Sequence, residues 1–195
     1  MSIPRRSWFR MQPPSDLHGL GHTARVMTWA CVLTRGTQWF DTVVWAAVCH
    51  DLRREDDGLD PRHGFRAGSW VRKKLPGLLR QPPADLELIA RACDWHVCRD
   101  RDAEWDHPTL WLLKDADGLD RARLYDLDPS FLRHPETLQW VDWAKALYQT
   151  TADLDDPLLI WSVAADLGLP VAELPEWMER QAQNLASGAC ERSGE

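Results

Sequence analysis

The sequence predicts an all-α protein, and three observations support this prediction. Apolar residues recur at the helical period in most segments. Proline and glycine divide the chain into pieces of helix length, and the alternating apolar and polar runs that would indicate strands are absent. The expected helices cover residues 16–34, 41–52, 62–75, 84–97, 108–124, 136–150, 157–167 and 173–187.

Particular residue types in the sequence mark where these helices begin and end. Residues that cap a helix or suit its first turn mark the starts, whereas glycine and proline mark the stops. The start signals are Ser15 or Asp16 for the first helix, Pro83 for the fourth and Pro108 for the fifth. The stop signals are Gly36, Pro76 and Gly168.

The 195 residues suit one domain, which at this length buries roughly 70% of the surface of the unfolded chain. We find no composition change that would divide residues 1–195 into two domains. Residues 126–195 carry expected helices but no group of reactive side chains, and we interpret them as a helical extension.

Charge and hydropathy exclude several classes of protein. The net charge is -7, and the absence of a basic patch argues against duplex nucleic acid as a partner. No segment approaches the roughly 20 apolar residues of a membrane span, and the N-terminus does not resemble a secretory signal. We therefore expect a cytoplasmic protein that does not bind membranes. The five cysteines form no CxxC pair, and we interpret them as reduced core thiols.

The chain contains 12 tryptophans without a fixed spacing. A helical core filled with large rings explains most of them. Trp140, Trp143 and Trp161 are compatible either with a homodimer interface or with packing inside the chain.

Four expected helices place a metal-competent side chain on an apolar stripe, namely His22, His50, His96 and Asp117. A single histidine on such a stripe is usually a hydrogen-bonded core residue. A buried carboxylate, however, must be neutralised, paired or coordinated. The apolar partners are Val26, Trp29 and Leu33 for His22, Val43 and Ala47 for His50, Leu86, Ile89 and Cys93 for His96, and Leu110 and Leu113 for Asp117.

Asp51 follows His50 at the end of its helix and is close enough to join the same group. If the helices converge, one divalent cation between these imidazoles and carboxylates would satisfy all of them. The donors are nitrogen and carboxylate oxygen without thiolate, which favours Mn, Fe, Co, Ni or Zn.

Three motifs resemble the HD superfamily of metal-dependent phosphohydrolases. They are HGLGHTARV at residues 18–26, the His50-Asp51 pair after an apolar helix, and KDADGLDRARL at residues 114–124. The stretch 50–64 is similar to an uncharacterised bacterial subgroup, and the resemblance as a whole covers residues 15–124. It implies a helical bundle of the HD-domain type.

The resemblance implies that one metal is held by His22, His50, Asp51 and Asp117. Asp117 is favoured over Asp115 because it occupies the family's ligand position, and the apolar stripe independently selects it. Many members bind a second metal through two further histidines, and His63 and His96 fit that role here. We therefore expect one or two divalent ions, with Asp51 as the bridge.

The resemblance implies hydrolysis of a phosphate ester or anhydride of a small phosphorylated metabolite by a metal-activated water, with a nucleotide as the favoured substrate. Asp51 would be the central catalytic residue. His18 is either a catalytic contact, a partner of a ligand or a surface residue, and Lys114 is a weaker candidate for contacting phosphate. Arginines that either bind substrate phosphate or pair with nearby acids are Arg53, Arg54, Arg121 and Arg123.

Two other functions stay open. Six ligands would also suit a non-haem di-iron oxygenase, because some HD-fold proteins use O₂. A non-catalytic module that senses a nucleotide is the third hypothesis, and the complete ligand set argues against it.

Overall fold

A computed structural model describes residues 3–186 of the chain. The regular structure of this part is helical apart from one isolated bridge between Leu79 and Leu185, which confirms the predicted all-α class. The α-helices are α1 (Leu20–Thr34), α2 (Phe40–Cys49), α3 (His63–Lys73), α4 (Leu75–Leu78), α5 (Leu86–Trp95), α6 (Pro108–Asp120), α7 (Val141–Thr151), α8 (Pro157–Asp166) and α9 (Glu173–Asn184). Short 3-10 helices are η1 (Arg6–Trp8), η2 (Asp100–Asp102), η3 (Arg121–Leu124), η4 (Pro129–Phe131) and η5 (Pro135–Trp140).

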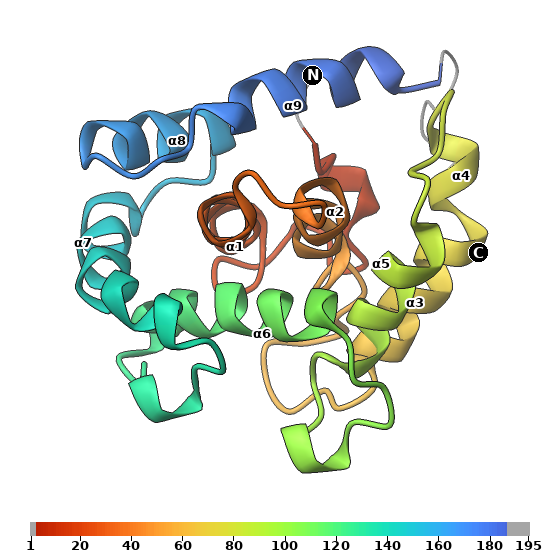
Figure 1. Cartoon of the computed structure of the whole chain (residues 1–195). Coiled ribbons are helices and arrows are strands. Elements are labelled where there is room, and N and C mark those ends of the chain that lie inside the picture. The colour runs from red at the N-terminus through yellow and green to blue at the C-terminus, as the bar shows by residue number, and fades with distance from the viewer. Residues whose placement is uncertain (1–2, 187–195) are drawn as a thin grey trace.

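Helices α1 and α2 pack side by side at the centre of the molecule, and the other helices surround them (Figure 1). Helix α6 crosses below both of them, α5 with α3 covers the side of α2, and α8 covers the side of α1. This position explains the composition of the central pair. Every residue from Thr42 to Cys49 is buried, and α1 buries almost its whole circumference, as expected for a helix enclosed on all sides.

Helices α3 and α5 approach closely because α3 has glycine where it faces α5. A Cβ atom on Gly68 would lie 2.6 Å from the carbonyl oxygen of Ala90, and one on Gly64 would lie 2.6 Å from that of Cys93. Neither side chain would fit without moving the backbone. The close approach brings the first residue of α3, His63, next to His96, the residue that follows α5.

The expected extension packs on the central helices. Trp161 of α8 is buried and its indole N–H donates to the carbonyl of Ala24 in α1. Trp177 of α9 is fully buried and meets Trp45 of α2 edge-on, with ring centroids 5.2 Å apart. Trp161 therefore belongs to the interior of the chain, whereas Trp143 is 39% exposed.

Several expected helices differ from the observed ones. The first begins at Leu20, because the Ser15 hydroxyl accepts the N–H groups of Leu17 and His18 and forms a turn ahead of the helix. Pro76 lies in the first turn of the short helix α4 and does not simply end α3, and proline suits that position.

The helix expected at 136–150 begins as the 3-10 helix η5 and becomes α-helical only at Val141. The last expected helix ends at Asn184, and its expected final residue, 187, lies outside the described residues.

Cys31, Cys49 and Cys93 are buried free thiols, as expected, and burial raises the pKa of Cys31 to about 12. Cys98 is half-buried, and Cys190 lies outside the described residues. Within residues 3–186, no helix combines the length and the apolar character needed to cross a membrane.

We predict that Trp177→Ala lowers the free energy of unfolding by about 3–5 kcal/mol, because it leaves a cavity between α9 and α2. Urea denaturation followed by far-UV circular dichroism measures this. Trp143→Ala serves as the matched control and should change stability by no more than about 0.5 kcal/mol. A small effect of Trp177→Ala, equal to that of the control, would mean that α9 does not pack on α2.

Candidate metal centre

Helix ends carry four histidines and an aspartate into the interior of the molecule. His22 lies in the first turn of α1, His50 and His96 directly follow α2 and α5, and His63 begins α3. The backbone N–H groups of His50 and His96 still donate to carbonyls of the preceding turn, at Ala46 and Ala92. The apolar faces of these helices are therefore what hold the imidazoles in the core. All four histidines and Asp51 are buried.

The first pair of imidazoles brings two ring nitrogens face to face. Nε2 of His22 lies 3.1 Å from Nε2 of His50. On the opposite side of each ring, Nδ1 of His22 lies 2.7 Å from Oδ2 of Asp120, and Nδ1 of His50 lies 2.8 Å from the carbonyl oxygen of Ala47. A carbonyl or an ionised carboxylate only accepts, so Nδ1 carries the hydrogen and Nε2 of each neutral ring is a lone pair. Two such lone pairs at this distance need a cation or a proton between them.

The second pair repeats this arrangement. Nε2 of His63 lies 3.1 Å from Nε2 of His96. Nδ1 of His63 donates to the carbonyl oxygen of Asp60 at 2.5 Å, and Nδ1 of His96 donates to that of Cys93 at 2.7 Å. A hydrogen bond on the far nitrogen fixes the tautomer and the orientation of a ring, as in most histidine ligands of metals. All four rings therefore present a lone pair in the same manner.

Asp51 lies between the two pairs and turns one oxygen toward each. Its Oδ2 lies 3.4 Å from Nε2 of His22 and 3.8 Å from Nε2 of His50. Its Oδ1 lies 2.9 Å from Nε2 of His63 and 3.6 Å from Nε2 of His96. Ligands bound at about 2.1 Å to one cation are about 3.0–3.4 Å apart, which is close to these separations. The carboxylate is thus in the position of a bridge between two cations.

Asp117 of α6 completes the first group from the side of the cavity described below. Its Oδ1 lies 3.5 Å from Nε2 of His22 and 3.9 Å from Nε2 of His50. Three overlapping groups of ligand atoms, each within 4.8 Å of one another, therefore have the composition of a metal site. The donor set of imidazole nitrogen and carboxylate oxygen fits a divalent ion. The groups are His18, His22 and Asp51; His22, His50 and Asp117; and His50, Asp51 and His96.

Asp115 has a different role from Asp117. It is fully buried and accepts the backbone N–H groups of Arg133 and His134 and the hydroxyl of Thr137. These bonds fasten the segment before η5 to α6. Asp117, the aspartate that the apolar stripe selected, is the one that lies next to His22 and His50.

The surroundings favour the unprotonated forms of His50 and Asp117 but the protonated form of His22. Burial lowers the pKa of His50 to about 4, although the charges of Asp51 and Asp117 oppose this. Burial raises the pKa of Asp117, but the neighbouring His50 and His22 outweigh it and lower that pKa to about 2. Burial and Arg123 lower the pKa of His22, whereas the carboxylates of Asp120 and Asp51 raise it and prevail.

Asp120 is a site residue that the sequence reasoning missed. It is buried, and besides His22 it holds the guanidinium of Arg25, whose Nε donates to Oδ1 at 2.6 Å. The available signal was its spacing in KDADGLDRARL, since a residue three after Asp117 lies on the same side of α6. Its hydrogen bond to Nδ1 orients the ring of His22.

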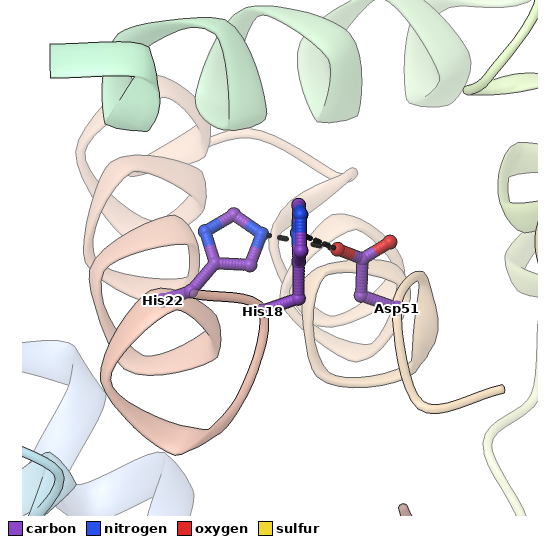
Figure 2. Close-up of side chains that lie close together, drawn as sticks. All are labelled: His18, His22 and Asp51. Carbon is purple, nitrogen blue, oxygen red and sulfur yellow. Dashed lines mark hydrogen bonds and ion pairs between the residues drawn. The ribbon is translucent and has the colours of Figure 1, made fainter. Parts of the chain in front are cut away.

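His18 lies at the edge of the centre, beside the bridging carboxylate. Its Nδ1 is 3.0 Å from Oδ2 of Asp51, and Nη2 of Arg123 is 3.4 Å from the same nitrogen. Figure 2 shows the rings of His18 and His22 on the same side of the Asp51 carboxylate, with dashed lines from both to one of its oxygens. Burial lowers the pKa of His18, although Asp51 opposes this.

A cavity of about 880 Å³ opens onto the centre, and Asp51, His63, His96 and Asp117 form part of its wall. It brings together most of the residues expected to contact substrate. The cationic side chains that line it are Arg54, Arg99, Arg101, Lys114, Arg121, Arg123 and Arg133.

The arginines expected to contact substrate differ in their hydrogen-bond partners and in whether they line the cavity. Arg53 does not line the cavity, and its guanidinium donates to the carbonyl of Trp8 at 3.2 Å. The chain turns sharply after α2, so the adjacent Arg54 points the other way and lines the cavity. Arg54 also donates to the carbonyls of Asp56 and Gly58 and so shapes the loop that leads to His63.

Arg121 and Arg123 both line the cavity, but only Arg123 is buried. Arg121 pairs with Asp126, and Arg123 donates to the carbonyls of Leu17 and Asp120. Lys114 is buried, and its ammonium donates to the carbonyl of Cys98 at 2.6 Å and to Asp100 at 2.7 Å.

No protein-family model matches this chain, and searches of the curated proteins and of the solved structures found no significant match.

We predict that Asp120→Asn weakens the binding of Mn²⁺ or Zn²⁺ by about 10- to 100-fold, because His22 loses its charged hydrogen-bond partner. Calorimetric titration of chelator-treated protein measures the affinity. His107→Ala, which changes a histidine that caps α6 at its start, is the control and should bind metal like the parent protein. Equal affinity in Asp120→Asn and the parent would show that Asp120 has no part in orienting the ligand.

Proposed function

We propose that this chain is a metal-dependent phosphohydrolase of the HD superfamily that cleaves a small phosphorylated metabolite, with a nucleotide as the favoured substrate. The observation that carries the proposal is the pairing of imidazole lone pairs on both sides of Asp51, next to a cavity rich in cationic side chains. The order of His22, His50-Asp51 and Asp117 along the chain supports the assignment to the superfamily.

A bound divalent ion lowers the pKa of a coordinated water and offsets charge on a phosphoryl oxygen. The residues that would hold one ion are His22, His50, Asp51 and Asp117, and His63, His96 and Asp51 would hold a second. The chemistry of the donors favours Mn, Fe, Co, Ni or Zn. Asp117 forms part of the cavity wall, so a substrate in the cavity would lie beside the ligands.

The charge of the cavity supports an anionic substrate. Seven lysine or arginine side chains line it against five aspartates, of which Asp51 and Asp117 are candidate ligands, although the whole chain carries a net charge of -7. Guanidinium groups recognise phosphate through paired hydrogen bonds. Arg123 is the best-placed of the expected contacts, because it is buried and lies beside His18.

The cavity is also lined by apolar side chains, which suit the remainder of a metabolite, such as a base. The side chains of Val97, Leu124, Leu127, Phe131 and Leu132 line it. Phe131 is 71% exposed, so its ring is available for stacking on a planar group.

We predict that the purified protein with Mn²⁺ releases phosphate or nucleoside from members of a nucleotide panel. His50→Ala and Asp51→Ala should each reduce kcat/KM by at least about 100-fold, because each removes one of the four side chains that would hold the first ion. His107→Ala and Trp143→Ala, both remote from the ligands, are the controls. Activity that survives in both ligand variants would rule out the proposed mechanism, and tight nucleotide binding without turnover would favour the sensing function instead.

The second pair of histidines favours one alternative, a non-haem di-iron oxygenase. His63 and His96 complete a six-ligand arrangement, with Asp51 between two sites, which suits two iron ions as well as two other metals.

Oxygen uptake by iron-loaded protein tests the alternative. The phosphohydrolase proposal predicts no oxygen uptake above that of the Mn²⁺-loaded sample, and phosphate release with Mn²⁺. Substrate-dependent oxygen uptake that is lost in His63→Ala and His96→Ala, together with an absence of phosphate release, would replace the phosphohydrolase by the oxygenase.

A further inference from the structure

Two cations in the wall of the cavity converge on one carboxylate. The ammonium of Lys114 donates to Oδ1 of Asp100 at 2.7 Å. The guanidinium of Arg133 holds the same carboxylate through two hydrogen bonds, from Nε to Oδ2 and from Nη2 to Oδ1, each at 2.9 Å. This forked geometry is the one in which arginine recognises carboxylate and phosphate groups. All three residues line the cavity.

Both cations are also anchored without Asp100. The backbone N–H of Arg133 donates to Asp115 at 2.8 Å, and its Nη1 lies 3.4 Å from the same buried carboxylate. Lys114 lies on α6, and its ammonium donates to the carbonyl of Cys98. Departure of Asp100 would therefore leave the two cations where they are. Lys114, Arg133 and the remaining partner Asp115 would then together carry a net charge of one positive unit.

The backbone at Asp100, by contrast, lies on the surface. This residue begins the 3-10 helix η2, in which no residue is buried, and its side chain is 45% exposed. Lys114 is almost wholly covered, so its nearest counter-charge comes from a surface loop and not from the core. Because no residue of η2 is buried, its movement uncovers no core residue, and an incoming anion would replace the bonds that Asp100 makes to the two cations.

The position of the pair relative to the metal centre is set by α6. Lys114 precedes Asp117 by three residues, so the two lie on the same side of the helix and one turn apart. An anionic group that replaced the Asp100 carboxylate would therefore lie in the same cavity as a phosphoryl group at the metal ligands, and near it.

We propose that Lys114 and Arg133 form a second anion-binding site, for a phosphate group, and that Asp100 occupies this site as a displaceable internal anion. This proposal rests on the proposed function and narrows its substrate class. The substrate carries a second anionic group besides the one that is hydrolysed, and it binds by replacing Asp100. The segment at residues 99–102 then opens away from the cavity, whereas the carbonyl of Cys98 stays bonded to Lys114.

The test is the binding of inorganic phosphate by the full-length protein, measured calorimetrically with and without prior dialysis against EDTA. We expect Asp100→Asn to bind phosphate about tenfold more tightly than the parent in both samples, because two charge-assisted donors are released. Asp128→Asn is the matched control. It removes one charge from the same cavity wall, where Asp128 accepts from the backbone of Ser130, and should change affinity by no more than about twofold.

Two double variants assign the effect to the cations. The increase in phosphate affinity should disappear in Asp100→Asn/Arg133→Gln and in Asp100→Asn/Lys114→Met. Because there are two variants, the test can still be made if one of them does not fold. In the parent, saturating phosphate should increase hydrogen exchange at residues 99–102. A gain equal to that of Asp128→Asn, or a gain that persists in the folded double variants, would overturn the proposal. None of these readouts depends on hydrolysis, so failure of the proposed function would be seen separately.

Discussion

The arrangement of the molecule depends on one electrostatic constraint at its centre. Four imidazoles are fixed by hydrogen bonds on Nδ1, and their Nε2 lone pairs meet in two pairs, each at 3.1 Å, with the Asp51 carboxylate between them. Lone pairs in this position repel each other, and burial of a carboxylate costs several kcal/mol unless it is compensated. Cations between these atoms would remove both costs, and metal binding would then stabilise the folded state.

The rest of the fold supports this centre in two ways. The enclosed helices α1 and α2 exclude water from the side of His22 and His50, and the glycine contacts between α3 and α5 set the separation of His63 and His96. Behind the ligands, Asp120 holds His22 and is itself held by Arg25, whose guanidinium also donates to the carbonyl of Thr151 at the end of α7. The extension is thereby connected to the centre through buried polar contacts as well as through packing.

Sequence reasoning reached the fold class, and it selected side chains that the structure brings together, because both follow from local patterns. Apolar residues at the helical period predict a helix even where the helix is buried. The apolar stripe of α6 contains Asp117 but not Asp115, so it distinguishes two aspartates that are only two residues apart. The pattern could not reveal which of Arg53 and Arg54 lines the cavity, since the turn after α2 decides this.

Long-range partners were equally hidden from the sequence. The contact of Asp120 with His22 spans 98 residues, and that of Arg133 with Asp100 spans 33. Likewise, the 3-10 start of the helix expected at 136–150 depends on the bonds that draw His134 and Thr137 toward Asp115. Such features follow from tertiary packing, which outweighs local propensity.

Anomalous X-ray diffraction from crystals grown with Mn²⁺ tests the central claim most directly. The account predicts an anomalous peak within about 2.3 Å of Nε2 of both His22 and His50, with a second such peak at His63 and His96 when both sites are filled. Crystals in which the manganese peaks lie elsewhere, and in which the paired imidazole nitrogens still face one another, would show that a shared proton holds these rings and would contradict the account.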